Sequence, residues 1–169
     1  MSRANCSISW SLKLLVLALA VTLAGCGFRL RGTYDLSPAL QQVAVVSTSP
    51  YGDMTHILKN RLRASDVVVA EDGAGDVAEI QLLDEVLEER TLSLFDTGQV
   101  AEYELLYRLK VRIRSVGGEP LEQEVRVQRQ YLDDPNKALA KGREKDLLLM
   151  EMREAAADRI LRLMATYKG

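Results

Sequence analysis

Cysteine and histidine, which supply most metal ligands and many catalytic bases, are scarce in this sequence. Its 169 residues include two cysteines and one histidine, His56. A zinc site needs several such ligands, and the sequence contains no G-x-S-x-G, P-loop or G-x-G-x-x-G motif. His56 falls between apolar positions of an expected helix, where a lone histidine is usually a surface or packing residue. The sequence therefore predicts no metal site and no enzyme.

An excess of positive charge is also absent. The formal net charge is -2, so the overall charge gives no reason to bind nucleic acid. Hydrophobic residues make up 47% and charged residues 27% of the chain, a balance that supports a globular core rather than disorder. The length is typical of one domain.

The N-terminus has the pattern of a secretion signal. Arg3 and Lys13 flank an N-terminal region that leads into an uncharged run over residues 14–25, LLVLALAVTLAG. This run is shorter than the roughly 20 apolar residues of a membrane-spanning helix. A basic start, a short apolar run and small residues at its end are typical of a signal peptide. We expect residues 1–25 to be removed, with an uncleaved membrane anchor as the alternative.

A cysteine directly follows this run. Residues 23–26, LAGC, resemble the bacterial lipobox, in which the cysteine thiol is acylated and the signal is cut just before it. We expect Cys26 to carry N-acyl and S-diacylglycerol groups, since stable anchoring takes more than one chain, and we expect no other cofactor. Cleavage also removes Cys6, so Cys26 has no partner for a disulfide. By resemblance to the lipoprotein sorting rule, Gly27 in place of aspartate favours the outer membrane.

Hydrophobic periodicity predicts one α+β domain over residues 41–169, which follows a lipidated tether over residues 26–40. Two helices packed on one face of a mostly antiparallel sheet of about four strands satisfy the order of the elements. A helix-prone stretch over residues 132–142 precedes the last helix, and Gly142 is a candidate interruption. The expected strands cover residues 42–47, 78–94, 103–114 and 122–131, with 67–72 as a short candidate, and the expected helices cover 52–65 and 144–168.

Two of these stretches have the clearest apolar faces. The strand over residues 103–114 alternates an apolar face with a charged one, as in an antiparallel sheet that is buried on one side. The last helix repeats apolar residues at a spacing of three or four. The apolar residues are Tyr103, Leu105, Tyr107, Leu109, Val111 and Ile113 on the strand and Leu149, Met152, Ala156, Ile160, Leu163 and Tyr167 on the helix.

Four basic residues, called the basic stripe below, occupy the charged face of that strand. They alternate along the chain and so point the same way, and like charges in a row need compensation. One interpretation is cross-strand pairing with carboxylates. The other is a surface for an anionic partner such as the phosphates of lipopolysaccharide, and the pattern leaves both open. The basic stripe comprises Arg108, Lys110, Arg112 and Arg114; Arg126 is a candidate addition, and the candidate carboxylates are Glu85, Glu89, Glu122 and Glu124.

Three stretches resemble motifs of one bacterial family, the lipopolysaccharide-assembly lipoproteins called LptE. Residues 26–32, CGFRLRG, resemble the start of these lipoproteins. Residues 133–160 resemble the family's D-N-P-x-x-A-L-A-K segment and the helix after it, although here the aspartate directly precedes the proline and the asparagine follows it. Residues 98–105, GQVAEYEL, resemble its G-Q-x-A-E-Y motif, with Gly98, Gln99, Glu102 and Tyr103 at the matching positions.

This resemblance implies a non-enzymatic outer-membrane lipoprotein with two helices against a four-stranded sheet. LptE proteins sit as a plug inside the β-barrel LptD, assist its assembly and, together with it, deliver lipopolysaccharide to the cell surface. Members also bind lipopolysaccharide, and the lysine that closes the A-L-A-K match, here Lys141, is implied to take part. Enteric members carry a basic residue after the phenylalanine before G-Q, whereas here Phe95 is followed by Asp96.

The expected partners are therefore LptD, lipopolysaccharide and, through the lipid anchor, the outer membrane; nucleic acid is not among them. We expect the Gly98 turn and residues 133–141 to form one tip, where Lys141 meets a lipid A phosphate. Arg108, Lys110 and Arg112 are further candidates for lipopolysaccharide binding. The alternative is a pilotin-like lipoprotein that escorts another outer-membrane channel without binding glycolipid.

Overall fold

The computed structural model describes residue 10 and residues 36–71, 76–134 and 137–167. Apart from residue 10, the predicted signal peptide lies outside the described residues, as do Cys26 and the predicted tether as far as residue 35. Within the described ranges, no helix is both long and apolar enough to cross a membrane.

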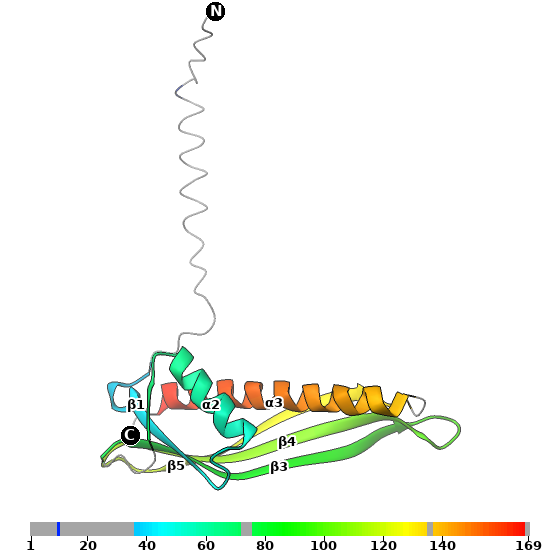
Figure 1. The fold of residues 1–169 in the computed structure, drawn as a ribbon, viewed down its shortest axis with the longest axis horizontal. Coiled ribbons are helices and arrows are strands. Elements are labelled where there is room, and N and C mark those ends of the chain that lie inside the picture. Colours follow the sequence, from blue (N-terminus) through cyan, green and yellow to red (C-terminus); the bar gives the residue numbers. More distant parts are fainter. Residues whose placement is uncertain (1–9, 11–35, 72–75, 135–136, 168–169) are drawn as a thin grey trace, which may run out of the picture. The chain divides into compact units, whose positions relative to one another are not determined.

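Five strands of the described residues form one sheet in the order β2-β1-β3-β4-β5 (Figure 1). The last three strands are antiparallel neighbours, whereas β1 pairs in parallel with both β2 and β3. A parallel pair needs a crossover connection, and the helix α2 supplies it between β1 and β2. The strands are β1 (Gln42–Ser47), β2 (Val68–Ala70), β3 (Ala78–Leu94), β4 (Val100–Arg114) and β5 (Leu121–Leu132).

Two helices, α2 (Asp53–Ala64) and α3 (Ala138–Thr166), pack on one face of this sheet, and a short 3-10 helix η1 (Pro38–Leu40) precedes β1. The predicted α+β class and the two-helix layer are confirmed. The sheet differs from the prediction in two details. It has five strands rather than about four because the short candidate strand pairs with β1, and its first three strands are parallel rather than antiparallel.

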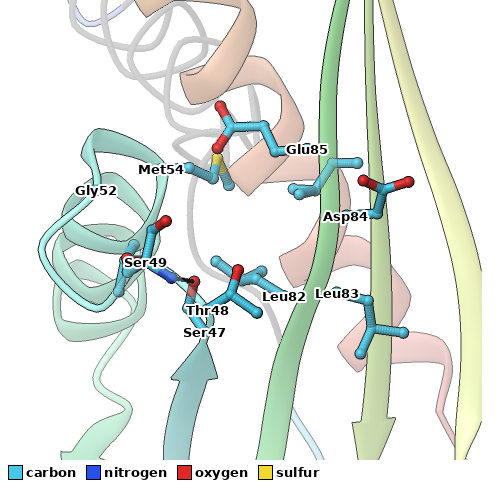
Figure 2. A pocket seen from close by; sticks show the side chains of 11 residues that line it. Ser47, Thr48, Ser49, Gly52, Met54, Leu82, Leu83, Asp84 and Glu85 are labelled. Atoms are coloured by element: carbon cyan, nitrogen blue, oxygen red, sulfur yellow. Dashed lines mark hydrogen bonds between the residues drawn. The ribbon is translucent and has the colours of Figure 1, made fainter.

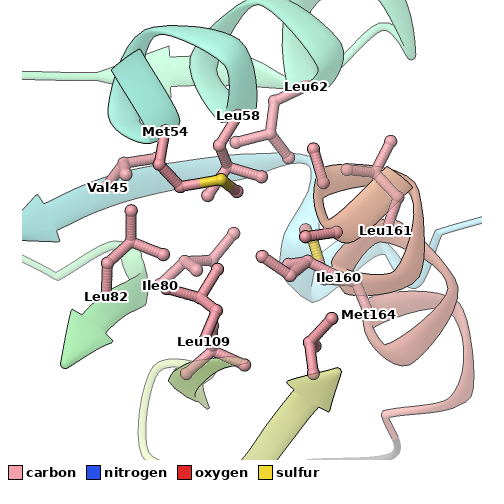
Figure 3. Packing of buried hydrophobic residues seen from close by; sticks show 14 of the residues in the cluster. Val45, Met54, Leu58, Leu62, Ile80, Leu82, Leu109, Ile160, Leu161 and Met164 are labelled. Carbon is pink, nitrogen blue, oxygen red and sulfur yellow. The ribbon is translucent and has the colours of Figure 1, made fainter. Parts of the chain in front are cut away.

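The core lies between the helices and the sheet. Every residue of the predicted apolar face of β4 from Leu105 to Ile113 is at most 1% exposed, which confirms that face. Burial of one such side chain contributes about 1.5–3 kcal/mol. Leu40 is also fully buried, so core packing already begins in η1. Figure 3 shows Met54, Leu58 and Leu62 of α2 and Ile160, Leu161 and Met164 of α3 packed over Val45, Ile80, Leu82 and Leu109 of the sheet.

The last helix is longer than the sequence predicts. α3 is continuous over 29 residues, and Gly142 lies inside it instead of interrupting it. Its buried stripe is also wider than predicted, because α3 packs against α2 as well as against the sheet. Of the predicted face, Met152, Ala156, Ile160 and Tyr167 are buried and Leu149 and Leu163 partly so, and Ala157, Leu161 and Met164 are buried in addition.

A register shift between residues 82 and 84 divides β3 into two parts. Before the shift, Ile80 faces the core. After it, Glu85 and Glu89 take positions opposite buried residues of β4, so both carboxylates lie on the helix side of the sheet. A one-residue slip moves side chains to the other face. The prediction that Glu85 and Glu89 pair with the basic stripe is therefore wrong.

Two identical substitutions in α3 test this packing. Leu161 is fully buried, whereas Leu147 is 61% exposed. Because a buried leucine leaves a cavity when truncated, we expect Leu161→Ala to lower the free energy of unfolding by about 2–5 kcal/mol. Leu147→Ala should change it by less than about 0.5 kcal/mol. Chemical denaturation followed by circular dichroism measures both, and equal losses would contradict the packing of α3.

Candidate functional site

The turn between β3 and β4 lies beside the start of α3 at one end of the sheet (Figure 1). The N–H of Asp133 donates to the carbonyl of Ala101 at 2.9 Å, which holds the end of β5 against the turn. Within the turn, the N–H of Phe95 donates to the carbonyl of Gln99 and the N–H of Gly98 to that of Phe95, both at 2.8 Å. Gly98 has a φ of 83°, which favours glycine. The two segments of the predicted tip are thus adjacent.

A groove of about 880 Å³, called the tip groove below, runs between these segments. Its walls come from the β3–β4 turn, the end of β5 and the first turns of α3. It is lined by Phe95, Asp96, Thr97, Gln99, Leu132, Asp133, Asp134, Lys137, Ala140, Lys141 and Glu144.

Carboxylates outnumber ammonium groups in the tip groove. The ammonium nitrogen of Lys141 lies 2.8 Å from the Glu144 carboxylate, and that of Lys137 lies 3.3 Å from Asp134. Asp96 adds a further carboxylate. Because both lysines already have carboxylate partners, an anionic ligand has to compete with a carboxylate for them.

Large apolar side chains are exposed around the same groove. Phe95 and Leu132, which line it, are 46% and 62% exposed. Leu94 and Leu139, which are next to lining residues in the sequence, are 60% and 89% exposed. Contiguous exposed apolar surface commonly marks a binding site. The tip therefore presents ammonium groups and apolar surface together, as an amphipathic ligand requires.

Two residues of the G-Q-x-A-E-Y match support the turn from behind the groove. The Glu102 carboxylate accepts a hydrogen bond from the Ser93 hydroxyl at 2.8 Å, across β3 and β4. The Tyr103 ring stacks on Tyr131 with ring centres 5.5 Å apart. Burial and the Glu89 carboxylate, to which its hydroxyl donates at 3.1 Å, raise the pKa of the Tyr131 phenol. These contacts hold the strands that carry the turn.

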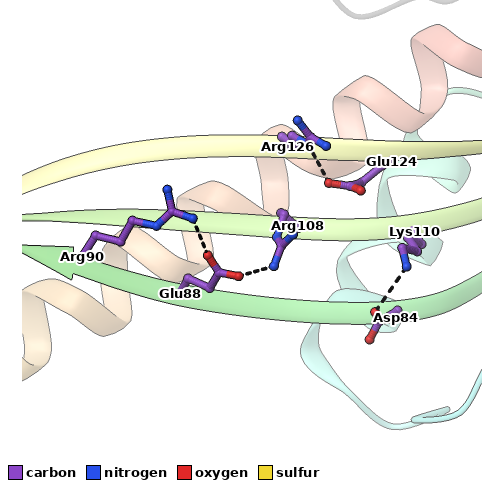
Figure 4. A network of polar contacts seen from close by, with 7 residues as sticks. All are labelled: Asp84, Glu88, Arg90, Arg108, Lys110, Glu124 and Arg126. Atoms are coloured by element: carbon purple, nitrogen blue, oxygen red, sulfur yellow. Dashed lines mark hydrogen bonds and ion pairs between the residues drawn. The ribbon is translucent and has the colours of Figure 1, made fainter.

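The basic stripe lies on the face of the sheet away from the helices, and each of its members is paired with a carboxylate. Figure 4 shows the pairs of Arg108 and Lys110. Glu122, one of the predicted partners, pairs with Arg112 across the strands, and Glu124 pairs with Arg126 of its own strand. The stripe and Lys141 occupy different faces, so they form no common site. The pairs are Arg108 with Glu88, Lys110 with Asp84 at 3.9 Å, Arg112 with Glu122 at 2.6 Å, Arg114 with Glu79 at 3.0 Å and Arg126 with Glu124 at 2.6 Å.

Ion pairs on the helix side fasten α3 to its neighbours. Arg153 donates to Glu85 of β3 at 2.9 Å and to Asp53 of α2 at 2.7 Å. Nearer the tip, Lys145 pairs with Glu89 of β3. Sequence reasoning missed the role of Arg153, because a charged residue beside an apolar helix face has the same pattern whether or not it meets a carboxylate.

A second hollow, of about 270 Å³, lies between the end of β1, the start of α2 and β3 (Figure 2). The Thr55 hydroxyl donates to the carbonyl of Ser49 at 2.9 Å, and the N–H of Ser49 donates to the Ser47 hydroxyl at 3.1 Å. Asp84 and Glu85 add carboxylates, and none of its described lining residues is basic. Its chemistry does not suit an anion.

His56 is exposed and lines a third hollow, of about 500 Å³, between α2 and α3. In the part of the chain that the structure describes, no three or more histidine, cysteine, aspartate or glutamate side chains form a group that could hold a metal ion. The absence of catalysis stays a prediction.

Comparisons with known proteins agree over most of the chain. Residues 40–164 match the family model described as lipopolysaccharide-assembly, LptE. The chain is 37% identical to the LPS-assembly lipoprotein LptE of Photorhabdus laumondii, over 90% of this chain and 84% of that protein. It is 38% identical to the LPS-assembly lipoprotein LptE of Pectobacterium atrosepticum, over 92% of this chain and 85% of that protein.

Two solved structures have the same fold. The crystal structure of rare lipoprotein B from Shewanella oneidensis has a TM-score of 0.68 at 43% identity, over 74% of this chain and 94% of that one. The solution structure of lipoprotein B from Nitrosomonas europaea has a TM-score of 0.63 at 28% identity, over 80% of this chain and 88% of that one.

Proposed function

The chain belongs to the LptE family of lipopolysaccharide-assembly lipoproteins, and from this membership we propose that it plugs the outer-membrane barrel LptD and binds lipopolysaccharide. In this proposal the acylated Cys26 holds it at the outer membrane of a Gram-negative cell. The observation that carries lipopolysaccharide binding is the presence of lysines and exposed apolar side chains in one groove, at the turn that matches the family motif.

The tip groove fits the two chemical parts of lipid A. Its phosphates form charge-assisted hydrogen bonds with ammonium groups, which Lys137 and Lys141 supply. Its acyl chains prefer apolar surface, which Phe95 and Leu132 supply within the same groove. A purely hydrophilic anion would use the lysines and leave the apolar side chains in water.

The neighbouring carboxylates make this binding an exchange. Glu144 competes with the phosphate for the Lys141 ammonium, and its carboxylate stays near the bound anion. Asp96 adds to that repulsion. Binding therefore depends on the apolar contacts as well as on the lysines, which suits a protein that has to release its ligand.

The face of the sheet away from the helices, called the open face below, suits a polar barrel lumen. Its basic stripe is paired with carboxylates, and most of these side chains are more than a third exposed. Exposed ion pairs add only about 0–1 kcal/mol each to stability, so folding alone gives little reason for so many of them. A better reason for these ion pairs is that the surface lies against the polar inner wall of the barrel.

Co-purification tests the partner. We expect the tagged full chain, extracted from the membranes of its own cells, to bring down LptD, because the plug and the barrel form one complex. Depletion of the chain should lower lipopolysaccharide at the cell surface. A pilotin-like lipoprotein would instead bring down a secretin and leave surface lipopolysaccharide unchanged, and that result would refute the proposal.

Charge reversal at the groove tests the ligand site. Lys141→Asp replaces an ammonium donor with a carboxylate, so we expect about 10- to 100-fold weaker binding of labelled lipopolysaccharide, from about 1.5–3 kcal/mol per charged hydrogen bond. Lys110→Asp is the matched control, because Lys110 is also paired with a carboxylate but lies on the open face. Lys141→Asp should still bring down LptD, because it leaves the open face of the sheet unchanged. Unchanged binding by Lys141→Asp, or an equal loss in Lys110→Asp, would place the ligand elsewhere.

Removal of the competing carboxylate tests the exchange. Glu144→Gln frees Lys141 without adding a positive charge, so we expect about 3- to 10-fold tighter binding, from the 0.5–1.5 kcal/mol of an ordinary hydrogen bond. Glu151→Gln makes the same change at an exposed position of α3 outside the groove lining and should have no effect. Weaker binding by Glu144→Gln would show that this carboxylate assists the ligand instead of competing with it.

A further inference from the structure

We propose that the outer edge of β5 pairs antiparallel with the same edge of a second copy of this chain, with Glu124 of each copy opposite Arg126 of the other. The pairing joins two sheets into one. It concerns the chain before a barrel surrounds it and does not depend on glycolipid binding. A closed barrel has no free strand edge to offer, so LptD itself would not fill this position.

β5 is an unusually long and regular edge strand. It runs over 12 residues, Leu121–Leu132, and among the described residues β4 is its only neighbouring strand. Its register with β4 runs from one end to the other without a shift. Exposed edges are usually protected by short length, bulges, proline or charged side chains, lysine above all. β5 has no bulge, and its sequence LEQEVRVQRQYL contains neither proline nor lysine. Its charged side chains are of both signs, so they do not repel a second copy in every register; they are Glu122, Glu124, Arg126 and Arg129.

The ladder shows which main-chain groups of β5 are on the free side. The N–H of Asp133 donates to the carbonyl of Ala101, in the same register that continues along β4 and β5. In an antiparallel strand, the main-chain N–H and C=O groups of alternate residues point toward one neighbouring strand, and those of the residues between point the other way. The main-chain groups of odd-numbered residues of β5 therefore face β4, and those of even-numbered residues face the free edge. In agreement, the carbonyl of Gln128 accepts a hydrogen bond from the Arg129 side chain at 2.9 Å. The outward residues are Glu122, Glu124, Arg126, Gln128 and Gln130.

The charges of these outward residues select one register. When Glu124 lies opposite Arg126 of the second copy, the two copies are related by a two-fold axis at Val125. This symmetry places Arg126 of the first copy opposite Glu124 of the second, so the same opposite-charge pair occurs twice. A shift that places Glu124 or Arg126 opposite itself brings like charges together, which is destabilising across strands. In the favoured register Glu122 faces Gln128, and Pro120, which has no N–H, falls beyond the paired stretch.

Both charged groups are available for this pairing. Arg126 is 65% exposed and now contacts Glu124 of its own strand at 2.6 Å. The Arg126 guanidinium lowers the pKa of Glu124, so the carboxylate is ionised at neutral pH. Since Arg126 and Glu124 are neighbours on the same face, each arginine in the pair of copies lies between two carboxylates. The Arg129 guanidinium, which donates to the Gln128 carbonyl on this edge, has to leave it.

Amide hydrogen exchange on the full mature lipoprotein in detergent, at rising ratios of protein to detergent, tests the pairing residue by residue. We expect the amides of Glu124, Arg126 and Gln128 to exchange at least about tenfold more slowly at the high ratio, since they gain carbonyl partners. Odd-numbered amides of β5 already face β4 and should not change. Glu124→Arg should abolish the effect, and the double reversal Glu124→Arg/Arg126→Glu should restore it.

Lys110→Glu is the matched control, because it disturbs an exposed ion pair of β4 without touching the edge, and it should leave the effect intact. Exchange at the even-numbered amides that is independent of concentration would overturn the proposal, including the case where only the lipid anchors associate. Failure of the double reversal to restore protection would also overturn it.

Discussion

The pairing of β3 with β4 determines where every other part of the domain lies. These are the two longest strands, and the register shift between residues 82 and 84 follows the first four residue pairs of their ladder. On one side of the shift, β3 contributes apolar residues such as Ile80 to the core beneath α2. On the other side it presents Glu85 and Glu89 to α3, where Arg153 and Lys145 meet them. Because of this shift, the helix side of β3 carries apolar residues before residue 82 and the hydrogen-bond acceptors Glu85 and Glu89 after residue 84.

The position of α3 depends on these acceptors. Apolar packing holds its second half, from Met152 to Met164, against the sheet and α2. Its first half has exposed apolar residues such as Leu139 and Leu147. It is held over the long hairpin by the Lys145–Glu89 ion pair and by the partial packing of Leu148 and Leu149. This first half carries Lys141 to the β3–β4 turn. The groove is therefore built where the core ends, which leaves its apolar side chains available for a ligand.

The sequence predicts the regular parts of this arrangement well. The alternation along β4 identifies its buried face, because no bulge interrupts that strand within the alternating stretch. The motif around Gly98 and the position of Lys141 predict that two distant segments meet, and they do. The partners of Glu85 and Glu89 were not predictable, since nothing in residues 84–90, DEVLEER, marks the register shift that places both side chains on the helix side of the sheet. The exposure of Leu132 and Leu139 was also hidden, because leucines in regular elements are normally expected to be buried.

We propose that the ligand binds at the tip groove and not on the basic stripe. A titration of the isotope-labelled lipoprotein with lipid A, followed by amide chemical shifts, distinguishes the two surfaces. We expect the largest shifts in two segments far apart in the sequence, residues 95–99 and residues 137–144, and we expect both segments to titrate at one affinity. Largest shifts over residues 108–112, with the tip unchanged, would place the ligand on the basic stripe instead.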